Sequence, residues 1–139
     1  MTIEVRYYSK TGNTKKLAEV VAKQVGVTAK PIMEQIEDDI DILFLGGAVY
    51  AFDIDPLLKT FIESLDPQKI KIVVIFSTAA ILQSAYGQIK GALKKQGIQV
   101  SSKEFHCPGH YKILRKGRPN SEDIKNAERF AQEIMKTGR

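Results

Sequence analysis

Apolar residues along this chain follow two spacings, one typical of strands and one typical of helices. Runs that are apolar throughout occur at 42–45 and 72–76. Such runs are typical of central parallel strands that are covered on both faces. Around them, apolar residues recur every three or four positions, as they do on the buried face of a helix. The pattern therefore predicts strands that alternate with helices.

The turn residues between these segments set the expected boundaries. Strands are predicted at about 3–8, 27–32, 42–45, 70–76 and 98–105, and helices at about 13–24, 56–65, 84–96 and from 121 onward. The acidic segment 33–40 is expected to form a turn or a single helical turn. Asp55, followed by Pro56, is an expected N-cap, as is Asn120 or Ser121. The buried helix faces are expected to include Leu57 and Met135.

Five strands that alternate with helices predict an α/β fold, in which a parallel sheet carries helices on both faces. The 139 residues, 43% of them hydrophobic, fit a single domain over 1–139. In such folds ligands bind beyond the carboxyl ends of strands, where the strand order reverses. The loops at 9–14, 46–55 and 77–83 all follow predicted strands, so we expect them to meet in one site.

Charge and cysteine content narrow the class of protein. The net charge is +5, with 9 Lys and Arg against 11 Asp and Glu in residues 1–89, and 12 against 5 in residues 90–139. The basic residues are spread out without interleaved aromatics, so we expect solvated helix faces and no nucleic-acid partner. The longest apolar run is too short and too rich in Gly to span a bilayer. One cysteine and no signal peptide predict a cytoplasmic protein.

The segment Tyr8-Ser9-Lys10-Thr11-Gly12-Asn13-Thr14 carries the strongest chemical signal. It places hydroxyl and amide side chains between a strand and the start of a helix, where unpaired N–H groups and the helix dipole favour an anion. A phosphate is the expected ligand. The segment lacks the Gly-Lys-Ser/Thr ending of a Walker A loop and the Gly-x-Gly-x-x-Gly pattern. Neither the Cys-x₅-Arg of a phosphatase nor the paired acidic residues of a receiver domain are present.

Ser-x-Thr-Gly-Asn-Thr after a first strand resembles the phosphate-binding loop of flavodoxins. The likeness extends to 46–50, to 76–78, and to 105–109 with 116–119, which are similar to short-chain members of that family. The resemblance implies a flavodoxin-like three-layer sandwich with a five-stranded parallel sheet in the order 2-1-3-4-5. It also implies FMN as the cofactor.

The resemblance assigns cofactor contacts to three groups of residues. They are Ser9, Lys10, Thr11, Gly12, Asn13 and Thr14 on the phosphate; Ala48, Val49, Tyr50 and Ala51 beside the isoalloxazine; and Ser77, Thr78, Ala79 and Ala80 as backbone donors to the pyrimidine edge. Tyr50 is the expected stacking ring.

An FMN-binding electron carrier that acts between a reductase and a terminal enzyme is the function that this resemblance implies. Its partners would be redox proteins, and it would need no catalytic acid, base or nucleophile of its own. Two alternatives stay open: a small FMN-dependent NAD(P)H:quinone-type reductase, and a binding or regulatory module that has lost FMN. His106, Cys107 and His110 lie close in sequence, but three ligands in a turn without a fourth make a weak metal site, so we expect none.

Overall fold

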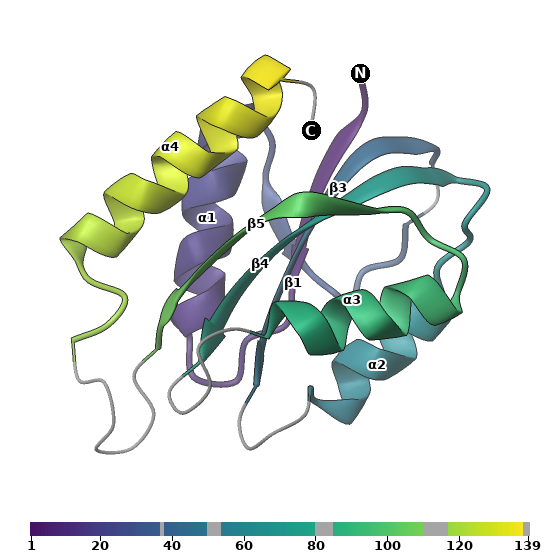
Figure 1. Cartoon of the computed structure of the whole chain (residues 1–139), viewed down its shortest axis with the longest axis horizontal. Coiled ribbons are helices and arrows are strands. Elements are labelled where there is room, and N and C mark those ends of the chain that lie inside the picture. Colours follow the sequence, from purple (N-terminus) through teal and green to yellow (C-terminus); the bar gives the residue numbers. More distant parts are fainter. Residues whose placement is uncertain (37, 50–53, 80–84, 110–116, 138–139) are drawn as a thin grey trace.

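Strands and helices alternate along the chain, as the apolar spacing predicts (Figure 1). The computed structural model describes residues 1–36, 38–49, 54–79, 85–109 and 117–137. Its elements are β1 (Ile3–Tyr7), α1 (Asn13–Val25), β2 (Ala29–Pro31), β3 (Ile40–Val49), α2 (Pro56–Glu63), β4 (Ile70–Ala79), α3 (Tyr86–Lys95), β5 (Val100–Pro108) and α4 (Ser121–Thr137). The segment from β2 to β3 contains turns and no helix in its described part, which confirms the turn predicted there.

The five strands form one parallel sheet in the order β2-β1-β3-β4-β5, which confirms the predicted order. Register is set by central apolar residues: Val5 of β1 lies opposite Phe44 of β3, and Phe44 lies opposite Val74 of β4. α1 and α4 cover one face of the sheet, and α2 and α3 cover the other (Figure 1). The architecture is thus the predicted three-layer sandwich.

Each face of the sheet has its own hydrophobic core. The core under α2 and α3 is built around Leu43, Leu45, Leu58, Ile62, Ile75, Ile89 and Leu93, and the core under α1 and α4 around Val5, Leu17, Val21, Phe44, Phe76, Ala127 and Ile134. Burial on both faces explains why the central strands are apolar without interruption. Removal of this apolar surface from water is the main force that holds the helices on the sheet.

β3 and β4 run three to four residues further than the sequence predicts, to Val49 and Ala79. Gly46 and Gly47 were expected to end β3, but both continue it, because each makes room for a large side chain. A Cβ on Gly46 would lie 2.2 Å from Cε2 of Phe76, the residue opposite it in β4. A Cβ on Gly47 would lie 2.6 Å from Cδ2 of Leu58 in α2. The two glycines therefore bring β4 and α2 into contact with the strand.

Several predicted boundaries and faces are wrong in detail. Leu57 and Met135 were assigned to buried faces, but they are 46% and 37% exposed. Each is next in sequence to the residue that does face the sheet, Leu58 and Ile134, and one residue turns a helix by about 100°. β5 begins at Val100 and continues to Pro108, beyond the predicted end at Phe105.

The pairing of β4 with β5 is interrupted by a bulge near Ser101. Val73 lies opposite Val100, but Ile75 lies opposite Glu104, so β5 carries extra residues at this point. Ser101 forms two hydrogen bonds at this irregularity. Its Oγ accepts one of 3.1 Å from the N–H of Lys103, and its carbonyl oxygen accepts one of 2.9 Å from the hydroxyl of Tyr86. Irregular pairing of this kind is common on the outer strands of sheets.

Arg6 of β1 holds the crossover between β2 and β3 against the sheet. Its side chain is 4% exposed and forms an ion pair with Glu4, with Nη2 2.8 Å from Oε1. It also donates to the carbonyl oxygen of Glu34 and, over 3.3 Å, to that of Gln35. A buried guanidinium needs such partners, because its desolvation is costly without them. Its five donors suit it to bridge a carboxylate and backbone carbonyls at once.

Gly91 of α3 offers a direct way to stabilise the fold. Its φ is not positive, it is exposed, and nothing lies within 4 Å of where a Cβ would be placed. Gly91→Ala is therefore expected to raise the free energy of unfolding by about 1 kcal/mol, because alanine loses less backbone entropy on folding. Urea denaturation would measure the change; a loss of stability would show that the position is not open.

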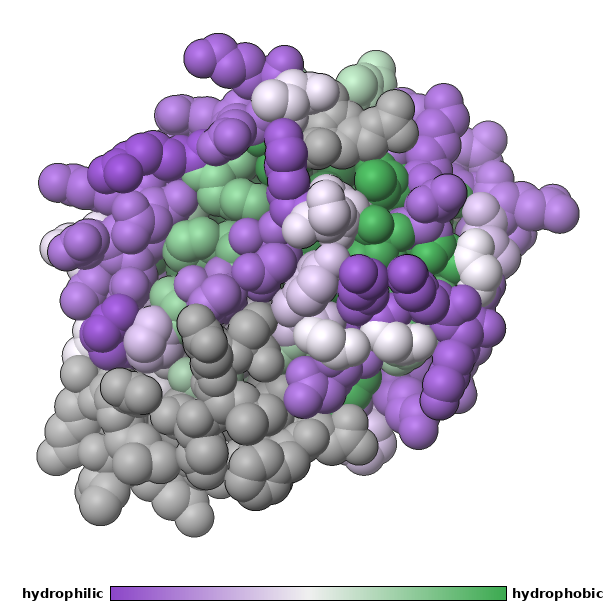
Figure 2. All heavy atoms as spheres, viewed as in Figure 1, coloured by the Kyte–Doolittle hydropathy of each residue, from purple (hydrophilic) through white to green (hydrophobic). Residues whose placement is uncertain are grey.

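Figure 2 shows hydrophilic side chains around much of the face that is seen in Figure 1, with hydrophobic residues visible between them toward its middle. β5 and α4 are joined by an aromatic contact in which the rings of Phe105 and Phe130 lie 5.9 Å apart at 37°. Among the described residues, no helix has the length and apolar character to cross a bilayer.

Candidate functional site

The carboxyl ends of β1 and β3 lie side by side, at the point in the sheet where the helix that follows a strand changes from one face to the other. α1, which follows β1, packs on one face, and α2, which follows β3, packs on the other. The N–H of Tyr8 donates to the carbonyl oxygen of Gly46 over 3.1 Å, so the segment after β1 starts in contact with β3. This is the position where parallel α/β sheets bind ligands.

The predicted phosphate loop adopts a tight turn that ends at the first residue of α1. Gly12 precedes the helix with φ 93° and ψ −9°, in the left-handed region that favours glycine. Its N–H donates to Oγ of Ser9 over 3.0 Å, and its carbonyl accepts the first helical bond, from Lys16 over 3.1 Å. Nothing lies within 4 Å of a Cβ placed on Gly12, so the backbone is open to a close approach.

The amino end of α1 has the character of an anion site. Its cap residue, Gly12, has no side chain to accept an N–H, and the first turn holds no acidic residue. The ends of α2 and α4 differ: Asp55 accepts from the N–H of Leu57 over 2.8 Å, and Asn120 accepts from that of Asp123 over 2.9 Å. In α3, which follows β4 at the same edge of the sheet, no side-chain cap is found among the described residues either. Helix N–H groups that no side chain caps favour a negatively charged ligand.

The side chains of the loop do not all face the same way. Lys10, Thr11 and Gly12 are exposed, and Ser9 and Asn13 are half-buried. Thr14 differs, since it is 1% exposed. Its Oγ1 lies 3.0 Å from Oγ1 of Thr78 and donates to the carbonyl oxygen of Gly47 over 3.4 Å.

The second and third predicted loops begin inside strands. Ala48 is buried in β3 and Val49 ends that strand, whereas Tyr50 and Ala51 lie outside the described residues. The contacts expected from these two residues therefore remain predictions.

The third predicted segment forms the end of β4. Ser77, Thr78 and Ala79 lie in β4, each paired with residues of both β3 and β5, and Ala80 lies outside the described residues. The expectation of a loop at 77–79 is wrong, because these residues continue the ladder between two neighbouring strands. The side chain of Ser77 has a local partner, since its Oγ accepts from the N–H of Ala85 over 3.3 Å.

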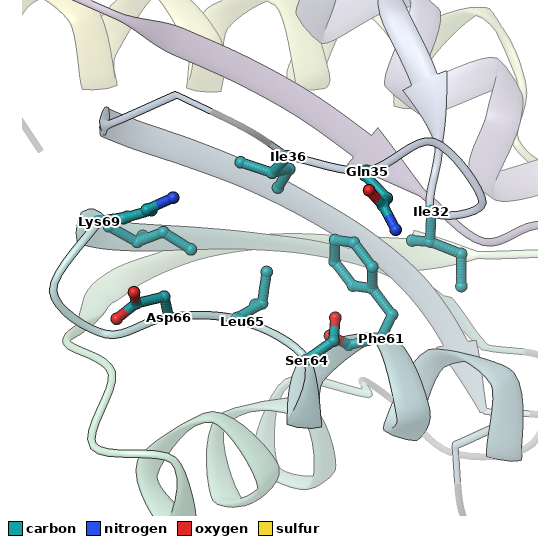
Figure 3. Close-up of a pocket in the computed structure, with 9 residues that line it drawn as sticks. Ile32, Gln35, Ile36, Phe61, Ser64, Leu65, Asp66 and Lys69 are labelled. Carbon is teal, nitrogen blue, oxygen red and sulfur yellow. The ribbon is translucent and has the colours of Figure 1, made fainter.

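A cavity of about 310 Å³ lies away from this edge of the sheet (Figure 3). It is lined by Ile32, Gln35, Ile36, Phe61, Ser64, Leu65, Asp66, Lys69 and Ile70. Phe61 and Leu65 point toward the crossover segment that holds Gln35 and Ile36. Because Ile70 begins β4, the cavity lies at the amino end of that strand, at the edge opposite the phosphate loop. It is therefore not part of the candidate site.

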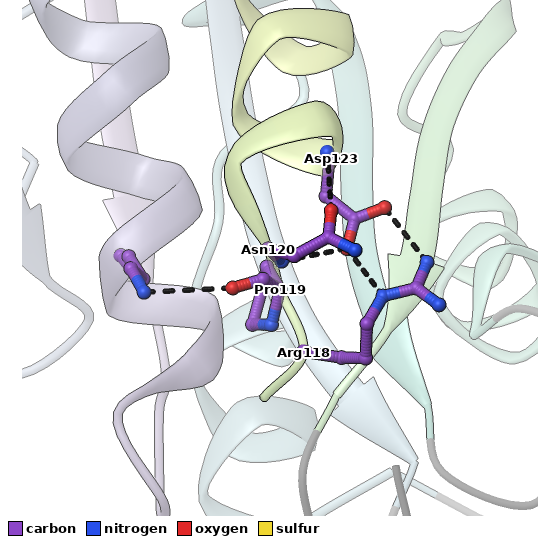
Figure 4. Close-up of polar contacts among 5 residues, drawn as sticks. Arg118, Pro119, Asn120 and Asp123 are labelled. Carbon is purple, nitrogen blue, oxygen red and sulfur yellow. Dashed lines mark hydrogen bonds and ion pairs between the residues drawn. The ribbon is translucent and has the colours of Figure 1, made fainter. Parts of the chain in front are cut away.

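A polar cluster that was not predicted from the sequence joins α4 to α1 (Figure 4). Asp123 is held by Arg118 through two bonds of 2.7 and 2.8 Å, and it also accepts from the N–H of Asn120 over 2.8 Å. Lys16 of α1 donates to the carbonyl oxygen of Pro119 over 3.5 Å. The available signal was the pattern Asn-x-x-Asp, a reciprocal cap at the start of a helix. Arg118 was not predicted to take part.

The Asp123 carboxylate is stabilised in its charged form. Its hydrogen bonds from Arg118 hold the pKa below its usual value, with a further contribution from the N–H of Asn120, against the opposing effect of burial. The same pairing raises the pKa of Arg118. The cluster is therefore ionised throughout the neutral range.

Cys107 is expected to be unreactive in the folded protein. It is 4% exposed, and its pKa is raised to about 12, chiefly by burial and further by the charge of Asp123. The thiolate is the reactive form, so at pH 8 a thiol reagent should modify the folded chain at least roughly 100-fold more slowly than the chain in urea. Equal rates in the two conditions would contradict this burial.

The described residues hold no group of three or more metal-ligating side chains. His106 is paired with Glu104, with Nδ1 2.8 Å from Oε2. His110 lies outside the described residues, so the expectation of ordinary packing around this turn remains a prediction.

The sheet order, and the helix that begins beside its switch point, define an α/β domain with a candidate ligand site. A family model for the flavodoxin domain matches residues 4–113, which is most of the chain. The chain therefore belongs to the flavodoxin family, which confirms the resemblance seen in its motifs.

Comparison with individual proteins supports the same fold. The chain is 27% identical over 137 residues to an uncharacterized protein of Methanocaldococcus jannaschii, covering 89% of this chain and 91% of the relative. It is similar to a flavodoxin from the domain Archaea, with a TM-score of 0.80, 15% identity, and 99% of this chain and 98% of that chain covered. It also resembles a short-chain flavodoxin associated with a non-canonical PDU bacterial microcompartment, with a TM-score of 0.70, 20% identity and 100% of both chains covered.

Proposed function

We propose that this protein binds FMN and carries electrons between a reductase and a terminal enzyme. The observation that supports this most is the amino end of α1, where the cap residue Gly12 has no side chain to bond the N–H groups of the first turn. Ser9 accepts the N–H of Gly12 and keeps its own hydroxyl proton for a ligand oxygen. A phosphate monoester with nearly two negative charges suits such a site.

FMN, when bound, supplies the redox chemistry, while the protein sets its position and electrostatic surroundings. The loop at 9–14 would hold the phosphate, and the segments after β3 and β4 would flank the ring. The described residues at this edge are mainly hydroxyls, amides and small apolar side chains; Lys10 is exposed, His106 is paired with Glu104, and Cys107 is buried with a raised pKa. Such a set suits binding and electron transfer better than acid–base or nucleophilic catalysis.

FMN titration followed by quenching of flavin fluorescence tests the proposal, with riboflavin as the matched ligand that lacks the phosphate. We expect FMN to bind at least roughly 100-fold more tightly than riboflavin, because its phosphate would accept several charge-assisted hydrogen bonds that riboflavin cannot form. Ser9→Ala combined with Thr11→Ala should reduce this preference. Thr60→Ala, an exposed hydroxyl on α2, should leave it unchanged. A chain that binds neither flavin would refute the proposal and favour a module without FMN.

The same preparation separates a carrier from a reductase. A carrier loaded with FMN should oxidise NAD(P)H with a quinone only when a separate flavodoxin reductase is added. Rapid oxidation without that reductase would assign the protein to the quinone-reductase class instead.

A further inference from the structure

Thr78 of β4 and Thr14 of α1 form a buried pair of hydroxyls beneath the phosphate loop. Their Oγ1 atoms lie 3.0 Å apart, and the two residues are 2% and 1% exposed. Each hydroxyl has one proton to donate. Since Thr14 gives its proton to the carbonyl oxygen of Gly47, Thr78 is the donor to Thr14. The first turn of α1 is thereby tied to both β3 and β4.

Gly109, just after β5, adds an independent contact at the same place. Its N–H donates to the carbonyl oxygen of Ala79 over 3.2 Å. A Cβ at this position would lie 3.0 Å from Nδ2 of Asn13 and 3.0 Å from Cβ of Thr78. Real Cβ contacts are seldom this tight, so any larger residue would displace the Asn13 side chain or the end of β4. Glycine therefore allows β5 to pack directly against the first residue of α1.

We propose that Thr78 and Gly109 are positioning residues, which set the affinity for the phosphate of FMN by fixing Asn13 and Thr14 at the start of α1. This inference rests on the proposed function. The prediction that the backbone of Thr78 donates to the flavin ring is separate from this role, which belongs to its side chain and concerns the phosphate end of the ligand. The donors of an anion site need fixed directions, because hydrogen bonds weaken steeply once they are misaligned.

The hydroxyl pair acts through α1 and not on the ring, so its loss should affect FMN and riboflavin differently. Thr78→Val keeps the shape of the side chain but removes the donor, and it leaves the oxygen of Thr14 without that bond. Thr78→Ser keeps the hydroxyl and serves as the conservative variant. Thr60→Val makes the same chemical change on the exposed face of α2 and serves as the control.

The experiment measures the dissociation constants of FMN and riboflavin, and the ³¹P resonance of bound FMN, for each variant. Thr78→Val should weaken FMN binding by roughly 10-fold and riboflavin binding by less than about twofold. It should also shift the ³¹P resonance. Thr78→Ser should restore most of the affinity, and Thr60→Val should change neither constant. Gly109→Ala should act like Thr78→Val, and it tests the inference even if Thr78→Val does not fold.

Three results would overturn the inference. Equal weakening of FMN and riboflavin would mean that the pair serves only stability. An unchanged FMN constant in both Thr78→Val and Gly109→Ala would mean that α1 holds its position without them. A wild-type chain that binds no flavin would refute the proposed function itself, which is a distinct result because it needs no variant.

Discussion

Gly46→Ala is expected to lower the free energy of unfolding by about 3 kcal/mol or more. The new Cβ would lie 2.2 Å from the ring of Phe76, which is fully buried at the centre of the sheet. Protein cores are closely packed, so overpacking of this kind strains the neighbouring side chains. For a chain of this length the melting temperature should fall by roughly 10 °C. Thermal and urea denaturation would measure both quantities.

A double variant tests the stated cause of this loss. Phe76→Leu alone costs stability, because it leaves space in the core, but it also removes the atoms that the Gly46→Ala methyl would strike. The two changes together should therefore be less destabilising than the sum of the single changes. Gly91→Ala, the same substitution at an open helix position, should stabilise the protein. Additive losses in the double variant would show that Phe76 is not the obstacle.

Asp123→Ala is expected to cost about 2 kcal/mol at pH 7, since it removes the reciprocal cap of α4 and both bonds to Arg118. The cost should remain moderate because the Arg118 side chain, 33% exposed, can reach water. Asn120→Ala removes only the other half of the cap, and it should cost less. Urea denaturation of the three proteins checks the order.

The contribution of Asp123 should depend on pH in a defined direction. Its pKa is lower in the folded state than in the unfolded state, so the unfolded chain binds the proton more readily in acid. The stabilisation is therefore complete above the unfolded pKa of about 3.9 and is lost as the pH falls through the folded value. The stability difference between wild type and Asp123→Asn should be constant from pH 5 to 8 and shrink below about pH 4. A difference that grows in acid would contradict this.

Much of the fold could be predicted because its information is local. A strand buried on both faces is apolar throughout, and a capped helix begins with Asp-Pro, so both can be recognised within a few residues. The ends of β3 and β4 could not be predicted in the same way. Whether Gly46 ends a strand or accommodates a ring depends on Phe76, which lies opposite it only after folding.

In the candidate site, too, the local features could be predicted from the sequence and the long-range contacts could not. The turn at Ser9 and Gly12 is encoded in consecutive residues, so its motif indicated its geometry. The partnership of Thr14 with Thr78 joins residues 64 positions apart, and no local spacing indicates it. The packing of Gly109 on Asn13 similarly depends on where β5 leaves the sheet. Sequence reasoning thus indicated the turn of the candidate phosphate loop but not the contacts that hold it in place.

The two outer strands of the sheet bear on how this protein behaves at high concentration. Exposed outer strands are templates for pairing with another chain, which leads to aggregation. Here β2 is three residues long and ends in Pro31, which has no N–H to donate. On the other side, the bulge at Ser101 uses backbone groups within the chain, and Lys103 places a charge beside it. Both borders of the sheet are therefore poor templates, which should oppose edge-to-edge aggregation although β3 and β4 between them carry long apolar runs.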